Sequence, residues 1–204
     1  MTHPAISLIE QRMSANRFDA SHALTNAEIE ELVRLATRAP TAYNLQNWRF
    51  IAVRTAEAKG RLRALAWGQP KVEDAAVTFI VCGVLPDAQA LPERLQPSVA
   101  AGYMPADMPS AWRTAAVAQY ADPRTARDEA VRSATLGAAT LIHAAAALGL
   151  ASGPMAGFDA EGVARAFDLP ENEVPVLLVA VGRAAPGNWP QKPRRPLAEV
   201  LEIS

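Results

Sequence analysis

The side chains with the greatest chemical potential lie in one short turn, in the segment APTAYNLQNWRF from Ala39 to Phe50. The turn joins an expected helix to an expected strand. It is dense in uncharged hydrogen-bonding groups, which belong to Thr41, Tyr43, Asn44, Gln46 and Asn47. Amides both donate and accept hydrogen bonds. Since a simple turn does not require so many such groups, the segment is a candidate ligand-binding site.

Side chains for acid–base or metal chemistry are sparse. The histidines His3, His22 and His143 are isolated, and no group of His, Asp and Glu has the spacing of metal ligands. His143 lies in an apolar segment, where a packed histidine is a more common finding than a catalytic one. A GxSxG motif, a Walker loop and a GxGxxG after a strand are all missing. An enzyme with this sequence would therefore depend on a bound cofactor.

The composition restricts the class of protein. The chain has 204 residues, 50% of them hydrophobic, and a formal charge of −1. A sizeable core is available, and the balanced charge gives no electrostatic case for nucleic acid or an acidic membrane as partner. Cys82 is the only cysteine, and the apolar runs are shorter than the roughly 20 residues of a membrane span. We expect a cytoplasmic protein with one domain, residues 1–204.

Periodicity and punctuation predict a mixed α+β protein. Thr25 and Glu28 have the spacing of a capping box at the start of a helix that ends before Pro40. Two apolar runs rich in β-branched residues are typical of strands buried on both faces, so helices must cover both sides of the sheet. Helices are expected within 3–13, 24–40, 55–67, 122–150 and 160–167, and strands within 48–54, 75–85 and 174–182.

Three further segments set expectations about assembly. The proline-rich stretch 85–121 is predicted to be a mobile loop with one short helix at most, and it is a candidate lid. The helix expected within 122–150 is apolar on all sides after its start, which places it at the domain centre or at a subunit interface. The tail, 185–204, ends in apolar residues that a disordered tail would not need, so we expect it to pack on a partner subunit.

Five segments, in this order, resemble the FMN-dependent nitroreductase family, and most closely its flavin-containing NADH oxidase branch. They are RMSANRFD, APTAYNLQNWRF, AWGQPKVEDA, ALGLASGPMAGFD and KPRRPLAEV. The second is similar to the family's APS-x-x-N-x-QPW-R-F, and the fourth to its LGL-x-S-x-PM-x-GFD. Each motif alone is short and degenerate. Together they span nearly the whole chain in family-like spacing.

The resemblance assigns FMN-binding roles to particular residues. It implies phosphate contacts from the two ends of the chain, flavin or ribityl contacts from the turn and from Gln69, and backbone contacts to flavin N5 from the PMAG segment. Asn16 departs from the family, which usually has Arg or Lys there, so phosphate binding would depend more on Arg194, with Arg17 as a substitute charge. The implied set is Arg12, Ser14, Asn16, Pro40, Thr41, Asn44, Gln69, Pro154, Met155, Ala156, Gly157, Lys192 and Arg194.

The resemblance also implies a fold and an activity. The fold would be a three-layer sandwich, a mainly antiparallel sheet between helices, in a domain-exchanged homodimer with FMN at the interface. The activity would be ping-pong transfer of hydride from NADH or NADPH, through FMN, to a nitroaromatic, a quinone or a similar acceptor. A flavin-consuming or dehalogenating enzyme and a non-catalytic FMN-binding protein are the alternatives. The sequence leaves open the acceptor, the choice of nicotinamide, and the roles of Tyr43, Gln46 and Asn47.

Overall fold

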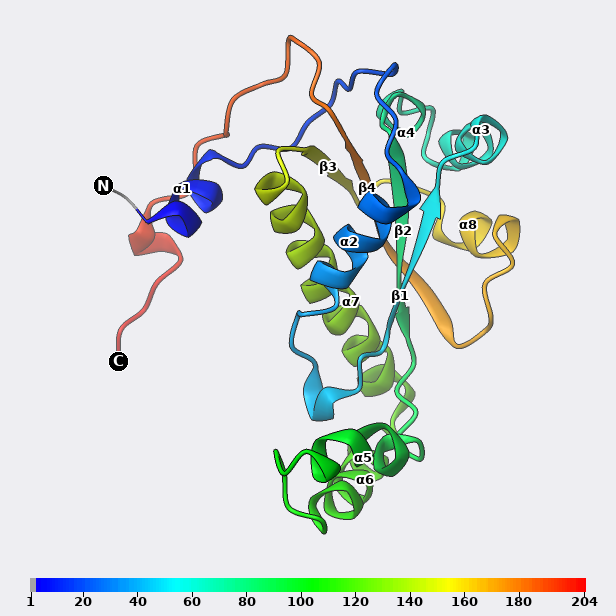
Figure 1. Cartoon of the computed structure of the whole chain (residues 1–204), viewed down its shortest axis with the longest axis vertical. Helices are drawn as coiled ribbons and strands as arrows, with labels where there is room; N and C mark the ends of the chain where they lie inside the picture. The colour runs from blue at the N-terminus through cyan, green and yellow to red at the C-terminus, as the bar shows by residue number, and fades with distance from the viewer. Residues whose placement is uncertain (1–2) are drawn as a thin grey trace.

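The computed structural model describes residues 3–204, and its centre is a four-stranded antiparallel sheet (Figure 1). The strands are β1 (Trp48–Val53), β2 (Val77–Val84), β3 (Ala151–Met155) and β4 (Glu173–Gly182). They lie in the order β1-β2-β4-β3, and each neighbouring pair is antiparallel. The α+β class predicted from the sequence is confirmed.

Side chains alternate along β2 and divide the core into two layers. Phe79 and Val81 face one layer of helices, whereas Ile80 and Cys82 face the other, and all four are fully buried. Burial, with a smaller effect of nearby Glu173, raises the pKa of the Cys82 thiol to about 12. The predicted burial of this strand on both faces is therefore confirmed, and its thiol is a core side chain.

Helices α2 (Asn26–Ala36) and α7 (Pro123–Ala147) cover one face of the sheet. The capping box of α2 is present: the Glu28 N–H donates to Thr25 Oγ1 at 3.2 Å, and the Thr25 N–H donates to the Glu28 carboxylate at 2.7 Å. The helix therefore begins where the sequence predicts.

Helices α3 (Ala56–Leu65), α4 (Lys71–Asp74) and α8 (Ala160–Ala166) cover the opposite face (Figure 1). They bury Leu62 and Val163, among others, against that side of the sheet. Two helical layers around one sheet form the predicted three-layer sandwich.

Strand β3 was not predicted as a strand. Its sequence, ASGPM, has low strand propensity, and Pro154 lacks the N–H that a central strand would need. It occupies the edge of the sheet, where proline is tolerated. This edge places the PMAG segment at the end of a strand.

The prediction of a mobile loop over 85–121 is wrong, because the segment contains the two helices α5 (Leu91–Ala100) and α6 (Met108–Gln119). Pro92 and Pro109 occupy the first turns of these helices, where proline is favoured because its missing N–H has no partner to lose. The two helices also share a small apolar core with Leu45. Two of the prolines that indicated a loop in the sequence, Pro92 and Pro109, therefore lie at the starts of helices.

The longest helix, α7, is buried on one face only. Ala134 and Leu141 pack against the sheet, whereas Thr135, Leu136 and Ala139 are exposed on the other side. The side chain of Leu136 is 41% exposed. The helix therefore does not lie at the centre of the chain, and its outer face is open.

Both ends of the chain extend away from the sheet (Figure 1). Helix α1 (Pro4–Gln11) exposes Ile6 and Ile9, and the tail contains one short 3-10 turn, η2 (Leu197–Glu199). The apolar tail residues Leu197, Val200, Leu201 and Ile203 are all exposed. Among residues 3–204, no helix is both long and apolar enough to cross a membrane.

Candidate functional site

The segment after α1 lies along strand β3, and its side chains from Ser14 to Asn16 are alternately exposed and buried. Ser14 forms a parallel bridge with Ser152, and the Ala15 N–H donates to the Ser152 carbonyl at 2.8 Å. The approach requires Gly153, since a Cβ there would lie 2.4 Å from the Ala15 carbonyl oxygen. With Ala15 fully buried, Ser14 is exposed. The R-x-S-x-N pattern is thus an extended segment fixed to the sheet edge.

Hydrogen bonds join the C-terminal tail to this segment: the Ala185 N–H donates to the Arg17 carbonyl at 3.1 Å, and the Asn188 amide makes the others. Asn188 Oδ1 accepts the N–H groups of Asn16 at 2.7 Å and Arg17 at 3.0 Å, and its Nδ2 donates to the Arg17 carbonyl at 2.8 Å. This clamp brings the tail beside the N-terminal segment, although the two are far apart in the sequence. Asn188 had no predicted role, and no sequence motif identified it.

Four of the predicted residues line one cavity of about 400 Å³. They are Arg12, Ser14, Pro154 and Arg194, and the exposed face of α7 contributes Ala139 and His143. Two guanidinium groups and a hydroxyl are donors suited to a phosphate. The structure therefore brings residues from the two ends of the chain to one cavity.

A lysine that sequence reasoning missed joins this group. Lys71 Nζ donates to Asn16 Oδ1 at 3.2 Å. Burial, and to a lesser degree the charge of Lys192, lowers the pKa of Lys71. The sequence contained one signal that could have identified Lys71. It is a cation two residues after Gln69, which is a predicted flavin contact.

The cations around this edge lack anionic partners. None of the ion pairs found among residues 3–204 includes Arg12, Lys71, Lys192 or Arg194. Lys192 Nζ instead lies 5.3 Å from the centroid of the Trp189 ring. Like charges brought together without a carboxylate favour a bound anion. The donor set at this edge fits a phosphate group.

The end of β3 meets the turn before α4. Gln69 Nε2 donates to the Gly157 carbonyl at 2.9 Å, and a Cβ on Gly157 would lie 2.8 Å from the Trp67 ring. Met155 is buried and Ala156 is exposed. Two of the predicted residues, Gln69 and Gly157, are therefore in direct contact.

The turn that follows Pro40 has an uncommon backbone. Tyr43, Asn44 and Gln46 have φ values of 52°, 54° and 49°, a region that residues other than glycine rarely adopt. Thr41 Oγ1 accepts the Gln46 N–H at 3.0 Å and so holds the turn closed. The side chains of Asn44 and Gln46 are exposed. Left-handed backbone of this kind concentrates at functional sites.

The structure gives two residues of this turn packing roles. Tyr43 Oη donates to Gln119 Oε1 at 2.7 Å, and its ring meets the Trp112 ring edge-on at 5.7 Å between centroids. Asn47 is buried and donates from Nδ2 to the Val84 carbonyl at 3.0 Å. These contacts attach the turn to α6 and to the end of β2.

The turn and the cation-rich edge do not meet within one chain. In Figure 1 the turn between α2 and β1 lies near α5 and α6, whereas α1 and the tail lie toward the other end of α7. None of the cavities we describe joins Pro40, Thr41 or Asn44 to Arg12. The predicted site residues therefore lie in two separate groups within one chain.

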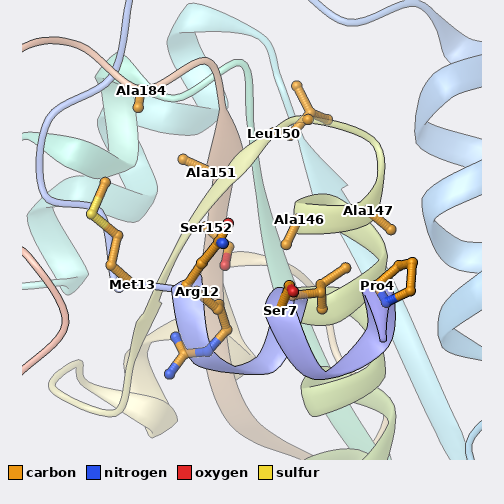
Figure 2. A pocket seen from close by; sticks show the side chains of 13 residues that line it. Pro4, Ser7, Arg12, Met13, Ala146, Ala147, Leu150, Ala151, Ser152 and Ala184 are labelled. Atoms are coloured by element: carbon orange, nitrogen blue, oxygen red, sulfur yellow. The ribbon is translucent and has the colours of Figure 1, made fainter. Parts of the chain in front are cut away.

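A second hollow, of about 560 Å³, lies beside the cation-rich edge. Figure 2 shows side chains of α1, the end of α7 and the start of β3 around it, with Arg12 among them. Its other lining residues are mostly apolar, including Leu8, Met13 and Leu150.

In the described part of the chain, no group of three or more His, Cys, Asp or Glu side chains could hold a metal ion.

Comparison with known proteins gives consistent matches. The model of the nitroreductase family matches residues 9–183. YodC of Bacillus subtilis, provisionally named an NAD(P)H nitroreductase, is 30% identical over 196 residues, which are 96% of each chain. A protein of Thermus thermophilus named NADH dehydrogenase is 37% identical over 175 residues, 85% of this chain and 83% of its own.

The solved structures match the fold as well. A nitroreductase-like protein of Streptococcus mutans is 27% identical with a TM-score of 0.85, and the match covers 98% of this chain and 97% of that one. A structure from Exiguobacterium sibiricum, determined in complex with FMN, is 24% identical with a TM-score of 0.90 and covers 100% and 99% of the two chains.

Proposed function

Because the chain belongs to the nitroreductase family, we propose that it is an FMN-dependent NAD(P)H oxidoreductase that reduces nitroaromatics, quinones or similar acceptors. The observation that carries the proposal is the group of cations without carboxylate partners beside the end of β3. Related proteins named for NAD(P)H or NADH, and a protein of the same fold in complex with FMN, support it. Residues 1–204 act as one domain in this proposal, in the cytoplasm.

The cation-rich edge holds the FMN phosphate. Arg12 and Arg194 donate paired N–H groups, Ser14 donates a hydroxyl, and Lys71 adds a positive charge. Asn16 replaces the family's usual cation, and its contact with Lys71 directs that ammonium toward the same place. Lys192 adds charge to the same edge from the tail.

The end of β3 provides the wall for the reactive part of the flavin. Pro154, Met155, Ala156 and Gly157 would hold the flavin there, with the backbone N–H groups of Ala156 and Gly157 as the donors to N5. Gln69 fixes this segment through the Gly157 carbonyl and places an amide at the pyrimidine edge of the ring.

The third part of the site comes from a second copy of the chain. The turn between α2 and β1, which contains Pro40, Thr41 and Asn44, lies away from α1 and the tail of its own chain in Figure 1, so in this proposal it reaches the flavin bound to the partner. Two open surfaces support a homodimer: the outer face of α7 and the apolar residues of the tail. Each FMN is then held by both subunits, and cofactor binding stabilises the dimer.

FMN, when bound, would supply the redox chemistry, which is acceptance of hydride from NADH or NADPH and transfer of electrons to an acceptor in a ping-pong sequence. The chain binds and orients the reactants, and water provides protons. In this division of roles the chain lowers the barrier by positioning the reactants.

The test is the colour of the purified protein. We expect a yellow protein that bleaches under NADH or NADPH without oxygen and recovers its colour when a quinone is added. A yellow protein that never bleaches would be a flavin-binding protein without this activity. A colourless protein that takes up no added FMN would contradict the proposal entirely.

A further inference from the structure

The turn between α3 and α4 presents Gln69 and Trp67 to the Gly157 backbone, and its own backbone is held in an unfavourable form. Trp67 and Gly68 both have positive φ, 54° and 73°. The tryptophan side chain is 73% exposed, so burial does not keep it in place. A non-glycine residue with this conformation persists where surrounding contacts hold it.

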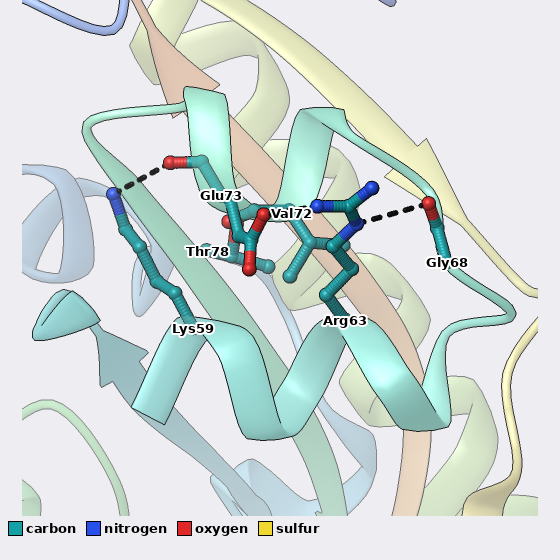
Figure 3. A network of polar contacts seen from close by, with 6 residues as sticks. All are labelled: Lys59, Arg63, Gly68, Val72, Glu73 and Thr78. Atoms are coloured by element: carbon teal, nitrogen blue, oxygen red, sulfur yellow. Dashed lines mark hydrogen bonds and ion pairs between the residues drawn. The ribbon is translucent and has the colours of Figure 1, made fainter. Parts of the chain in front are cut away.

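Arg63 supplies those contacts. Its Nε donates to the Gly68 carbonyl at 3.1 Å, while its own carbonyl accepts the Gly68 N–H at 2.9 Å, so both polar backbone groups of Gly68 are bonded to this residue. Its guanidinium also pairs with the Glu73 carboxylate on α4 (Figure 3). One side chain therefore connects the middle of the turn to the helix that follows it.

Neighbouring contacts hold the other parts of this network. Lys59 Nζ donates to the Glu73 carbonyl at 3.1 Å, and Thr78 Oγ1 donates to the Val72 carbonyl at 3.1 Å (Figure 3). The Asp159 N–H donates to the Leu65 carbonyl at 2.8 Å, which joins the chain after Gly157 to the end of α3. Two hydrogen bonds therefore connect the 156–159 segment to this region, one to Gln69 in the turn and one to Leu65 at the end of α3.

We propose that Arg63 is a positioning residue for the flavin site: it holds the Trp67–Gln69 turn, and the turn holds the Ala156–Gly157 backbone. Arg63 does not touch the expected flavin position itself. It acts through the Gln69 bond to the Gly157 carbonyl and through the packing of the Trp67 ring on Gly157. The inference rests on the proposed function for the role of that backbone, but the connection between the two segments is independent of FMN.

The experiment compares Arg63→Ala with Arg34→Ala. Arg34 is a matched control, because it also forms two bonds to a glutamate, Glu31, but lies on α2 away from the turn. Amide hydrogen exchange is measured on the FMN-free proteins. In Arg63→Ala we expect faster exchange in both 66–69 and 156–159 and unchanged exchange in β2, whereas Arg34→Ala changes neither segment.

FMN titration and conservative variants complete the test. We expect the FMN dissociation constant to rise about three- to tenfold in Arg63→Ala and by less than about twofold in the control, because the side chain is partly exposed. Arg63→Gln retains a donor for Gly68 and should recover part of the loss, and it replaces Arg63→Ala if that variant does not fold. Unchanged exchange in 156–159 would overturn the inference, as would uniformly faster exchange in β2. A wild-type protein that binds no FMN would contradict the proposed function alone.

Discussion

The sheet and the two ends of the chain show opposite use of apolar side chains. In β2 the residues from Val77 to Cys82 are fully buried, whereas the tail exposes 74% of Leu197 and 89% of Ile203. Burying a large apolar side chain contributes about 1.5–3 kcal/mol, so a chain rarely leaves several of them exposed together. The comparison teaches that the sheet is complete within one chain, whereas the ends leave apolar side chains exposed that the proposed dimer would bury.

The candidate site divides along the same boundary. Arg12 and Arg194 belong to the extended ends, whereas Thr41 and Asn44 belong to a turn attached to the body. The open face of α7 lies between these halves. A partner that covered this face would complete both the apolar surfaces and the site.

The largest effect is expected from a charge on that face. Leu136→Arg places a guanidinium on the exposed side of α7, outside the cavity that contains Arg12 and Arg194, where the proposed dimer would bury it without a partner. Such a charge costs about 3–5 kcal/mol, so we expect a monomer and at least about a hundredfold weaker FMN binding. Sedimentation measures the oligomeric state before FMN is added.

The matched control is Ala64→Arg, also at an exposed position in a helix but on α3. It should leave the oligomeric state unchanged. If both variants remained dimers, the interface would not include the outer face of α7. A dimer across α7 would then not explain why the ends of the chain expose apolar side chains.

The next largest effect is expected at the phosphate. Arg194→Ala should weaken FMN binding by about 10- to 100-fold, because a charge-assisted contact contributes about 1.5–3 kcal/mol. Arg195 is the control: it pairs with Glu199 at 2.9 Å and should be replaceable by alanine without effect on FMN. Fluorescence titration distinguishes the two, and equal affinities would remove Arg194 from the site.

A smaller effect is expected from the titration of Lys71. Burial and Lys192 lower its pKa in the free protein, and a bound phosphate would raise it by favouring the charged form. FMN binding therefore takes up a proton, and affinity decreases as pH rises through the lowered pKa. We expect about a three- to tenfold weaker affinity at about pH 10 than at about pH 8. Lys71→Met should bind weakly with no such slope, whereas Arg194→Ala should retain it.

The smallest effect on FMN binding is expected from a substitution at the start of α2, away from the candidate site. Thr25→Ala removes the hydroxyl of the capping box and should lower the free energy of unfolding by about 1 kcal/mol. Thr25→Ser retains the bond and should match the wild type. Neither variant should change FMN affinity, so a clear change there would show that the body and the site are less separate than we describe.

The sequence predicted the parts of the molecule that are determined locally. The capping box placed α2, and the apolar runs placed β2 and β4, because burial on both faces leaves a continuous apolar signal. The family motifs named residues at both ends of the chain, and in the structure Arg12 and Arg194 line one cavity.

The rest depends on contacts that no local pattern records. Strand β3 forms at the edge of the sheet despite its low strand propensity, and Pro92 and Pro109 lie in the first turns of helices that pack on Leu45. The clamp of Asn188 on residues 16–17 joins segments far apart in the sequence. Lys71 became a candidate only when the fold placed it beside Asn16.

The central claim, that each flavin site needs two copies of the chain, is tested most directly by subunit mixing. One variant, Arg12→Ala with Arg194→Ala, loses the phosphate half, and the other, Thr41→Ala with Asn44→Ala, loses the turn half. Each alone should bind little FMN at a concentration near the wild-type dissociation constant. After subunit exchange, half of the dimers contain one intact site, so about a quarter of wild-type binding should return. No recovery in a mixture shown to contain heterodimers would contradict the shared site.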